Sequence, residues 1–305
     1  MAISKIRVAV LRGGGTPTYE HSLDAGKTVL SLLREKEDAY EPQDIFVSKD
    51  GTWHLRGLPV EPHDALKYAD VAWNTLGADT ASKRILDTLG VHYIGGELVP
   101  SALSGNIQHA RTMYEREGLP TTRFKLLTED AFDDTELVHI FRNFLLPVTI
   151  RTQERGSTFS GKIARTYAEL EDTVKEAFMF SKKIVVEELL KGKIAVASII
   201  ENARNERLYA LLPAELKDGK VSSPGSFSTE EKRLLEAYAK RAHKALGLRH
   251  YSSSRFLITP RGKIYILETD TVPETIADSA LSKSLKATGW KEREFVEHLL
   301  NLAKE

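Results

Sequence analysis

The sequence has no cysteine in its 305 residues, which excludes disulfide bonds, thiolate metal sites and cysteine nucleophiles. It also has no net charge, because 43 Lys and Arg balance 43 Asp and Glu. A nucleic-acid-binding protein would need an excess of positive charge to neutralise phosphates, so we expect no such partner. No stretch approaches the roughly 18 uninterrupted apolar residues of a membrane span, and the start shows no signal-peptide pattern. We therefore expect a cytoplasmic protein.

The order of predicted strands and helices is typical of an α/β protein. A β-branched run at residues 6–11 ends in three glycines, and a helical pattern follows at about residues 22–36. Further short strands are predicted at residues 44–47, 71–73 and 92–94, which favours an open parallel sheet. The glycine turn can bring the backbone close to a ligand, although such turns are also common as purely structural features.

Length and composition indicate a globular protein with more than one domain. Hydrophobic residues make up 41% and charged residues 28%, which is ordinary for a globular chain, and 305 residues suit two or three domains. Beyond the first hundred residues, strands and helices continue in two further blocks. We predict an N-terminal α/β domain and two α+β lobes, at residues 1–98, 99–182 and 183–305.

Two carboxylates, Glu268 and Asp270, stand two residues apart at the end of a predicted strand. Side chains two apart on a strand share a face, so both should point into one space. Converging carboxylate oxygens suit Mg²⁺, which also keeps waters and substrate phosphates in its shell. The alternative is two solvated acids at an ordinary strand end.

A second segment is a strand that ends in a cation and leads into a loop of glycine and hydroxyl residues. Backbone N–H groups and hydroxyls of such a loop can cover phosphates while the cation offsets their charge. The alternative is a surface hairpin without a ligand. The candidate phosphate-binding residues are Arg151, Gly156, Ser157, Thr158 and Ser160.

A third segment is the strand at residues 183–188, which runs into a short turn. Backbone donors and acceptors at such a turn can recognise an adenine edge. A strand that simply leaves the core is the alternative. The three segments together, in this order, are more informative than any one of them.

Their order and spacing resemble the ATP-grasp superfamily, and within it the D-alanine–D-alanine ligase family. GGGTPTYEHSLDAGK resembles that family's opening, LPVTIRTQERGSTFSGK its phosphate-covering loop, and LETDTVPETIADSALSK its metal and substrate segment. The resemblance covers nearly the whole chain. It implies an ATP-grasp architecture in which two lobes clamp ATP, with Mg²⁺ or Mn²⁺ as the metal.

The resemblance also implies roles for individual residues. By role, the matching positions are Glu20 and Ser22 for the first D-alanine, Ser279 for the second substrate, Arg151 for the phosphates, Glu187 and Leu190 for the adenine, Arg255 for the tetrahedral intermediate, and Glu268 and Asp270 for the metal.

Several positions depart from the family's pattern. Residues 106–108 contain no counterpart of an expected lysine, residues 73–77 lack an expected histidine, and residues 217–228 are a short substitute for a long lid. Three further positions carry a different type of side chain: Ile194 for a ribose-binding acid, Leu257 for a metal-binding Asp, and Glu274 for a Gly beside the oxyanion.

Two hypotheses follow. The first is an ATP-dependent carboxylate–amine ligase that forms a dipeptide through an acyl phosphate, as in the synthesis of peptidoglycan precursors for the cell wall. Its substrates would be ATP and D-alanine or another amino acid, and the family implies a homodimer. The second is a degenerate homologue that keeps the fold and acts by binding, because inheritance of a fold does not guarantee inheritance of its chemistry.

Overall fold

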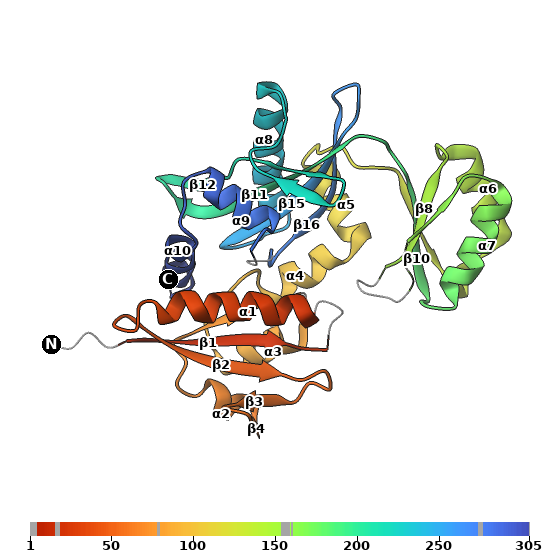
Figure 1. The fold of residues 1–305 in the computed structure, drawn as a ribbon. Helices are drawn as coiled ribbons and strands as arrows, with labels where there is room; N and C mark the ends of the chain where they lie inside the picture. Colours follow the sequence, from red (N-terminus) through yellow and green to blue (C-terminus); the bar gives the residue numbers. More distant parts are fainter. Residues whose placement is uncertain are drawn as a thin grey trace.

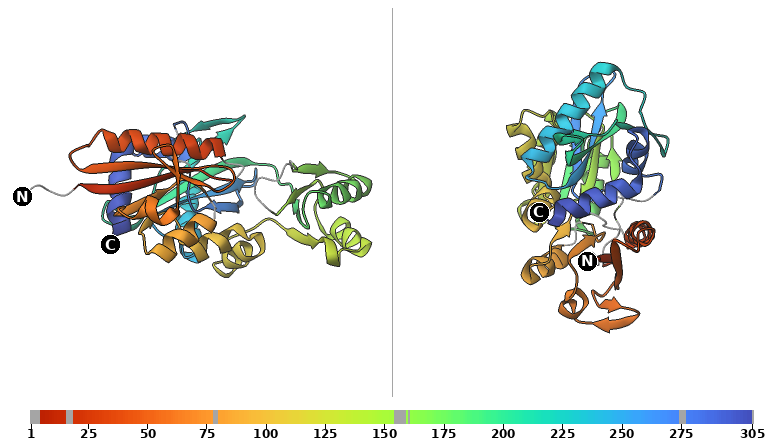
Figure 2. Two further views of the ribbon diagram at one scale, coloured as in Figure 1. Left: turned by 90° about the horizontal axis from the view of Figure 1, so that it is seen from below. Right: turned by 90° about the vertical axis from the view of Figure 1, so that its left-hand side faces the viewer.

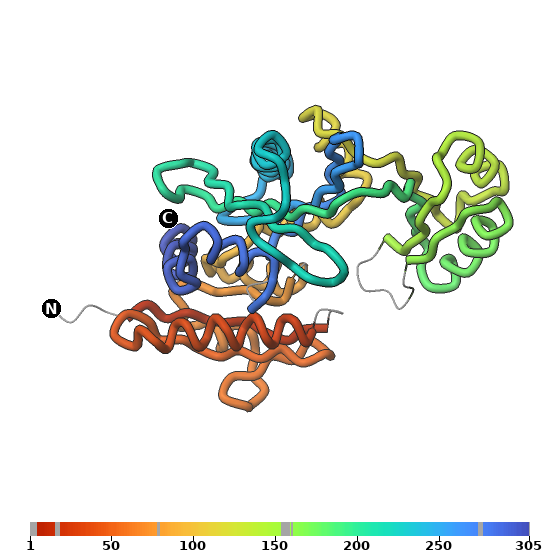
Figure 3. Tube along the Cα trace, turned by 45° about the horizontal axis from the view of Figure 1, so that its top comes forward, coloured from red at the N-terminus to blue at the C-terminus, as the bar shows by residue number. Residues whose placement is uncertain are grey.

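The structure is a computed structural model and describes residues 5–15, 19–77, 80–153, 159, 161–273 and 277–304. Figure 1 shows three blocks: an N-terminal layer, a C-terminal block packed on it, and a middle block set to one side. The same separation of the middle block is visible in the tilted tube of Figure 3. Among the described residues, no helix has both the length and the apolar character needed to cross a membrane.

The N-terminal block is a six-stranded sheet in the order β4-β3-β2-β1-β5-β6. Strands β2, β1, β5 and β6 pair in parallel, which confirms the predicted open parallel sheet. Strands β3 and β4 add an antiparallel edge that we did not predict. The strands are β1 (Ile6–Gly13), β2 (Tyr40–Val47), β3 (Trp53–Leu55), β4 (Leu58–Val60), β5 (Val71–Asn74) and β6 (Tyr93–Ile94). The helices are α1 (Tyr19–Arg34), α2 (Pro62–Leu66) and α3 (Thr80–Leu89).

The middle block is an antiparallel sheet in the order β7-β10-β8-β9, with two helices packed on it. Strand β10 follows residue 182 but pairs with β7 and β8, so this sheet extends past the predicted domain boundary to residue 188. The elements are β7 (Phe124–Thr128), the short 3₁₀ helix η1 (Glu129–Ala131), α6 (Asp134–Asn143), β8 (Val148–Thr152), β9 (Lys162–Ala164), α7 (Tyr167–Phe178) and β10 (Lys183–Glu188).

Helices α4 (Leu98–Gly105) and α5 (Ile107–Arg116) connect the first two blocks. The C-terminal sheet has the order β14-β13-β11-β15-β16, and β12 also pairs with β11. Its elements are β11 (Lys193–Ala203), β12 (Glu206–Ala210), β13 (Ala214–Lys217), β14 (Lys220–Ser222), α8 (Thr229–Ala245), β15 (Tyr251–Ile258), β16 (Ile264–Asp270), α9 (Ala280–Ala287) and α10 (Glu292–Lys304). The expected lid substitute at residues 217–228 therefore begins as a regular hairpin, β13–β14, which extends this sheet.

The hydrophobic cores show which blocks belong together. Val10 and Trp73 of the N-terminal sheet share one core with Ile200 of β11 and Phe295 of α10. Figure 2 shows α10 beside the N-terminal layer in both views. The three-domain division stays a prediction, and the first and third of its segments meet through this common core.

Candidate functional site

Four of the predicted site residues line one cavity of about 410 Å³ on the C-terminal sheet. Arg255 comes from β15, Glu268 and Asp270 from the end of β16, and Ser279 from the start of α9. The strand register brings them together, because Arg255 lies opposite Glu268 and Ser253 lies opposite Asp270. As predicted, the two carboxylates face one space, while their chemical roles stay predictions.

The polar groups of this cavity are held by short local contacts. Nη1 of Arg255 lies 2.9 Å from Oε1 of Glu268, and the two side chains are 47% and 43% exposed. Oδ1 of Asp270 accepts a hydrogen bond from the Val272 amide at 3.0 Å, and the Ser279 side chain caps the first turn of α9. A half-exposed ion pair is screened by water and contributes little to stability, so Arg255 and Glu268 can separate to contact a ligand.

The donor set suits a magnesium ion that is brought in with a phosphorylated substrate. Two carboxylates match the one or two that Mg²⁺ commonly takes from a protein when phosphates and waters fill its other positions. No group of three His, Asp or Glu side chains gathers as a possible metal site in the part of the chain that the structure describes. The assignment of Glu268 and Asp270 as the residues that would hold the ion stays a prediction.

Two of the departures from the family's pattern are neighbours in space. Ile194 of β11 lies directly opposite Leu257 of β15 on one side and opposite Leu216 of β13 on the other. This apolar row runs across the sheet next to the pair of Arg255 and Glu268. A carboxylate at Ile194 alone would lie between two hydrocarbon side chains and lose solvation. Ile194 and Leu257 therefore replace two acids by a single apolar contact between neighbouring strands.

A residue that we did not predict, Arg111 of α5, joins the middle block to the C-terminal sheet. It is 2% exposed, and it donates from Nη1 to the Ile266 carbonyl (2.5 Å) and from Nη2 to Oε1 of Glu187 (2.5 Å). The Thr122 hydroxyl donates to the same Glu187 oxygen. Burial lowers the pKa of Arg111, and the charge of Glu187 opposes that effect. The junction is thus a buried ion pair with further hydrogen bonds.

The contacts of Glu187 at this junction bear on its predicted role in binding adenine. Its carboxylate is occupied by Arg111 and Thr122, so an adenine contact would have to come from the backbone of β10 or from the half-buried Leu190. Arg111 lies one turn after Ile107, the region where the expected lysine is missing. A cation inside the buried stripe of an amphipathic helix was the signal that could have revealed Arg111 from the sequence.

The two predicted first-domain residues, Glu20 and Ser22, are not among the residues that line this cavity. Glu20 is exposed in the first turn of α1, whereas Ser22 is 2% exposed. Oγ of Ser22 accepts a hydrogen bond from the Gly13 amide (3.0 Å) and lies 3.1 Å from Oγ1 of Thr75. Gly13 has φ +97°, and a Cβ there would lie 2.3 Å from the Val47 carbonyl, so the turn requires glycine. In this arrangement Ser22 closes the glycine turn.

The phosphate-covering segment is described only in part. Arg151 is half-buried on β8, and its Nη1 lies 3.4 Å from the Thr152 carbonyl oxygen. It is close enough to Arg111 to influence the pKa of that residue, as is Glu268. The remaining positions, Gly156, Ser157, Thr158 and Ser160, together with Glu274, lie outside the described residues, so their roles stay predictions.

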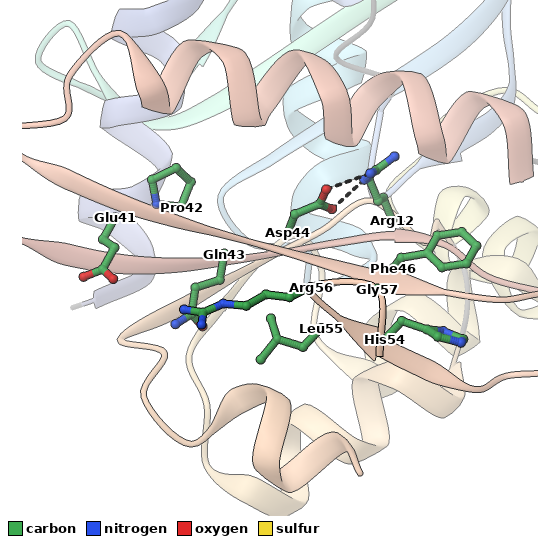
Figure 4. Close-up of a pocket in the computed structure, with 10 residues that line it drawn as sticks. All are labelled: Arg12, Glu41, Pro42, Gln43, Asp44, Phe46, His54, Leu55, Arg56 and Gly57. Carbon is green, nitrogen blue, oxygen red and sulfur yellow. Dashed lines mark hydrogen bonds and ion pairs between the residues drawn. The ribbon is translucent and has the colours of Figure 1, made fainter. Parts of the chain in front are cut away.

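A second cavity, of about 520 Å³, lies on the N-terminal sheet. Figure 4 shows its lining, in which Arg12 points to Asp44 and Phe46 lies near His54. Both oxygens of Asp44 accept hydrogen bonds from Arg12, at 2.6 and 2.7 Å, and this contact raises the pKa of Arg12. We place the candidate site at the smaller cavity, because it collects four of the residues predicted from the sequence.

Comparison with known proteins identifies the family of the chain. The family described as D-ala D-ala ligase C-terminus matches residues 113–301. The D-alanine–D-alanine ligase of Geotalea uraniireducens is 27% identical over 97% of this chain and 95% of its own length. The protein therefore has the ATP-grasp fold, and the chain belongs to the D-alanine–D-alanine ligase family.

Solved structures agree on the fold. The VanG D-Ala:D-Ser ligase from Enterococcus faecalis superposes with a TM-score of 0.85 at 18% identity, covering 98% of this chain and all of that one. The D-alanine–D-alanine ligase from Bacillus anthracis complexed with ATP has a TM-score of 0.80 at 20% identity, with coverage of 98% and 96%. At these identities the likeness is one of architecture.

Proposed function

We propose that this protein is an ATP-dependent carboxylate–amine ligase that joins D-alanine to a second amino acid. The observation that supports this most is the cavity that collects Arg255, Glu268, Asp270 and Ser279 in a chain of this family. The names of its relatives supply the substrate class. The proposal requires ATP and Mg²⁺ in that cavity.

In the proposed reaction, a carboxylate oxygen of the first amino acid attacks the γ-phosphorus of ATP, and ADP leaves. The amine of the second amino acid then attacks the acyl carbon, loses a proton and displaces phosphate. Glu268 and Asp270 would hold Mg²⁺, which when bound would offset the charge of the phosphates. Arg255 stabilises the negative charge that develops on the acyl oxygen.

The other predicted residues position the substrates. Arg151 offsets phosphate charge from the middle block, and Ser279 orients the second amino acid. The exposed Glu20 contacts the first amino acid, and the buried Ser22 acts indirectly by holding the glycine turn. Because Ile194 and Leu257 replace two acids, we expect ATP to bind more weakly than in relatives that keep them. We also propose that the protein is a cytoplasmic homodimer, and that the break between the two lobes follows β10.

The test is ADP formation by the purified protein with Mg²⁺, ATP and D-alanine, with the dipeptide identified by mass spectrometry. Glu268→Gln removes the charge that the cation needs, so we expect it to abolish turnover while unfolding stability changes by no more than roughly 1 kcal/mol. Glu230→Gln, which alters an exposed pair with Arg233, is the matched control and should keep full turnover.

Full turnover in Glu268→Gln would mean that the metal binds elsewhere. Failure of the unaltered protein to release ADP with any amino acid would contradict the proposed function and favour the binding-protein hypothesis.

A further inference from the structure

The hairpin β13–β14 forms one wall of the candidate cavity. Leu216 and Val221 lie directly opposite each other in the hairpin, so their side chains share a face. Both line the cavity, on the same face of the sheet as Arg255 and Glu268. The charged residues Lys217 and Lys220 at the turn are exposed. The lining therefore has a polar part and, beside it on the sheet, an apolar wall formed by Leu216 and Val221.

The apolar wall continues onto neighbouring elements. Val196 of β11 and Pro273, Ala280 and Leu281 near the start of α9 also line the cavity. Of these, Ala280 is partly exposed and follows Ser279, the residue proposed to orient the second amino acid, whereas Val196, Pro273 and Leu281 are buried beneath the cavity surface. A ligand that fills this space must present polar groups to one side and hydrocarbon to the other.

Contacts to α9 and to the loop before it fix the hairpin in place. Nζ of Lys283 donates to the Val221 carbonyl at 2.9 Å and lies 3.3 Å from Oδ1 of Asp278. Oγ of Ser223 lies 3.3 Å from Oγ of Ser284. Such contacts hold the apolar wall in position before a ligand arrives, which lowers the cost of ordering it on binding.

We infer that the second amino acid of the reaction carries an aliphatic side chain larger than methyl, which packs on Leu216 and Val221. This inference rests on the proposed function and adds a substrate class to it. Ser279 and Arg255 contact the polar part of that amino acid, and Lys283 is a positioning residue that keeps the wall against it. Each methylene buried there should favour the larger amino acid about fourfold in kcat/KM.

The experiment supplies D-alanine as the first amino acid and varies the second among alanine, 2-aminobutyrate, valine and leucine, in both enantiomers. Mixed dipeptides are quantified by mass spectrometry, and kcat/KM is measured from ADP release. We expect 2-aminobutyrate or valine to exceed alanine by about fourfold or more. Alanine as the best second substrate would overturn the inference while leaving the proposed function intact, whereas absence of any ADP release would overturn the proposed function.

Two variants test whether Leu216 and Lys283 cause the preference for a larger second amino acid. Leu216→Ala should lower the ratio of kcat/KM for valine over alanine at least threefold, because it removes hydrocarbon from the wall. Lys283→Met should lower the same ratio by freeing the hairpin, and Lys283→Arg should restore part of it. Lys286→Met, which changes a cation of α9 that pairs with Glu292, is the control and should leave the ratio unchanged. An unchanged ratio in Leu216→Ala would show that the preference arises elsewhere.

Discussion

The middle block and the remainder of the molecule are built differently. Between Leu127 and Val186, strands and helices enclose a core whose members all come from that block, as far as the described residues show. The N-terminal and C-terminal sheets instead share a core, in which Trp73 and Phe295 both take part. Apolar burial therefore unites the first and last thirds of the chain, whereas Arg111 links the middle block through polar contacts.

This difference bears on how the molecule could open. A shared apolar core resists relative movement, because separating its halves exposes hydrocarbon to water. A junction made by one guanidinium and a few hydrogen bonds can be rearranged at lower cost when a ligand supplies new partners. We therefore expect that a ligand which offers Arg111 or Glu187 new partners would let the middle block move against the body formed by the other two blocks.

The largest expected effect is that of Phe295→Ala. Phe295 is 2% exposed and packs edge-on against Tyr251, with ring centroids 5.6 Å apart. Truncating a buried aromatic side chain costs about 3–5 kcal/mol, and here the loss should fall on both sheets. Amide hydrogen exchange should accelerate in β1 and β15 together, while β8 and β10 keep their protection.

Ile140→Ala in the middle block is the matched counterpart, since Ile140 is also fully buried. It should cost about 2–5 kcal/mol and accelerate exchange in β8 and β10 only. Equal acceleration in all three sheets by either variant would show that the molecule unfolds as one unit.

The next prediction concerns the loss of stability when the junction between the middle block and the C-terminal sheet is broken. Arg111→Met leaves the Glu187 carboxylate, whose side chain is only 13% exposed, without its cation. Breaking a buried pair by removing one partner costs about 3 kcal/mol or more. We expect lower unfolding stability in urea and a raised KM for ATP. Arg233→Met, at an exposed ion pair, is the control and should leave stability nearly unchanged, because water screens that pair. A normal KM for ATP in Arg111→Met would mean that the junction does not shape the site.

The smallest expected effect is a loss of unfolding stability at low pH, caused by His250. His250 joins β15 to the N-terminal block, because its Nδ1 accepts from the Gly95 amide at 3.2 Å. Burial, and then the charge of Arg249, lower the pKa of His250 to about 4, with Glu201 acting in the opposite direction. As the pH falls from about 6.5 towards 4, the unfolded chain binds a proton that the folded protein does not. Stability should therefore fall by roughly 2–3 kcal/mol over that range.

His250→Asn tests this, because asparagine tolerates the positive φ of 66° at this position. The variant should lose most of the decline in stability between pH 6.5 and 4, measured by urea unfolding at each pH. The same decline in both proteins would assign the acid sensitivity to groups other than His250.

Much of the architecture was predictable from local pattern. The run of β-branched residues before the glycine turn, and Glu268 and Asp270 two apart at a strand end, gave the strand, the turn and the shared face of the carboxylates. The hairpin β13–β14 was missed, since its strands are short and Lys217 and Lys220 next to the turn gave no strand signal. Arg111 was missed because an arginine on a helix is usually solvated.

What the sequence alone determined is whatever depends on neighbours along the chain: strand and helix positions, the absence of thiol chemistry, and the family resemblance carried by its motifs. Only the tertiary structure decided that Ile194 lies between Leu216 and Leu257, that Glu187 is paired with Arg111, and that the first and last thirds share a core. These facts follow from strand register and helix packing. One residue of shift in register moves a side chain to the opposite face of a sheet, so such contacts exist only once the whole chain has folded.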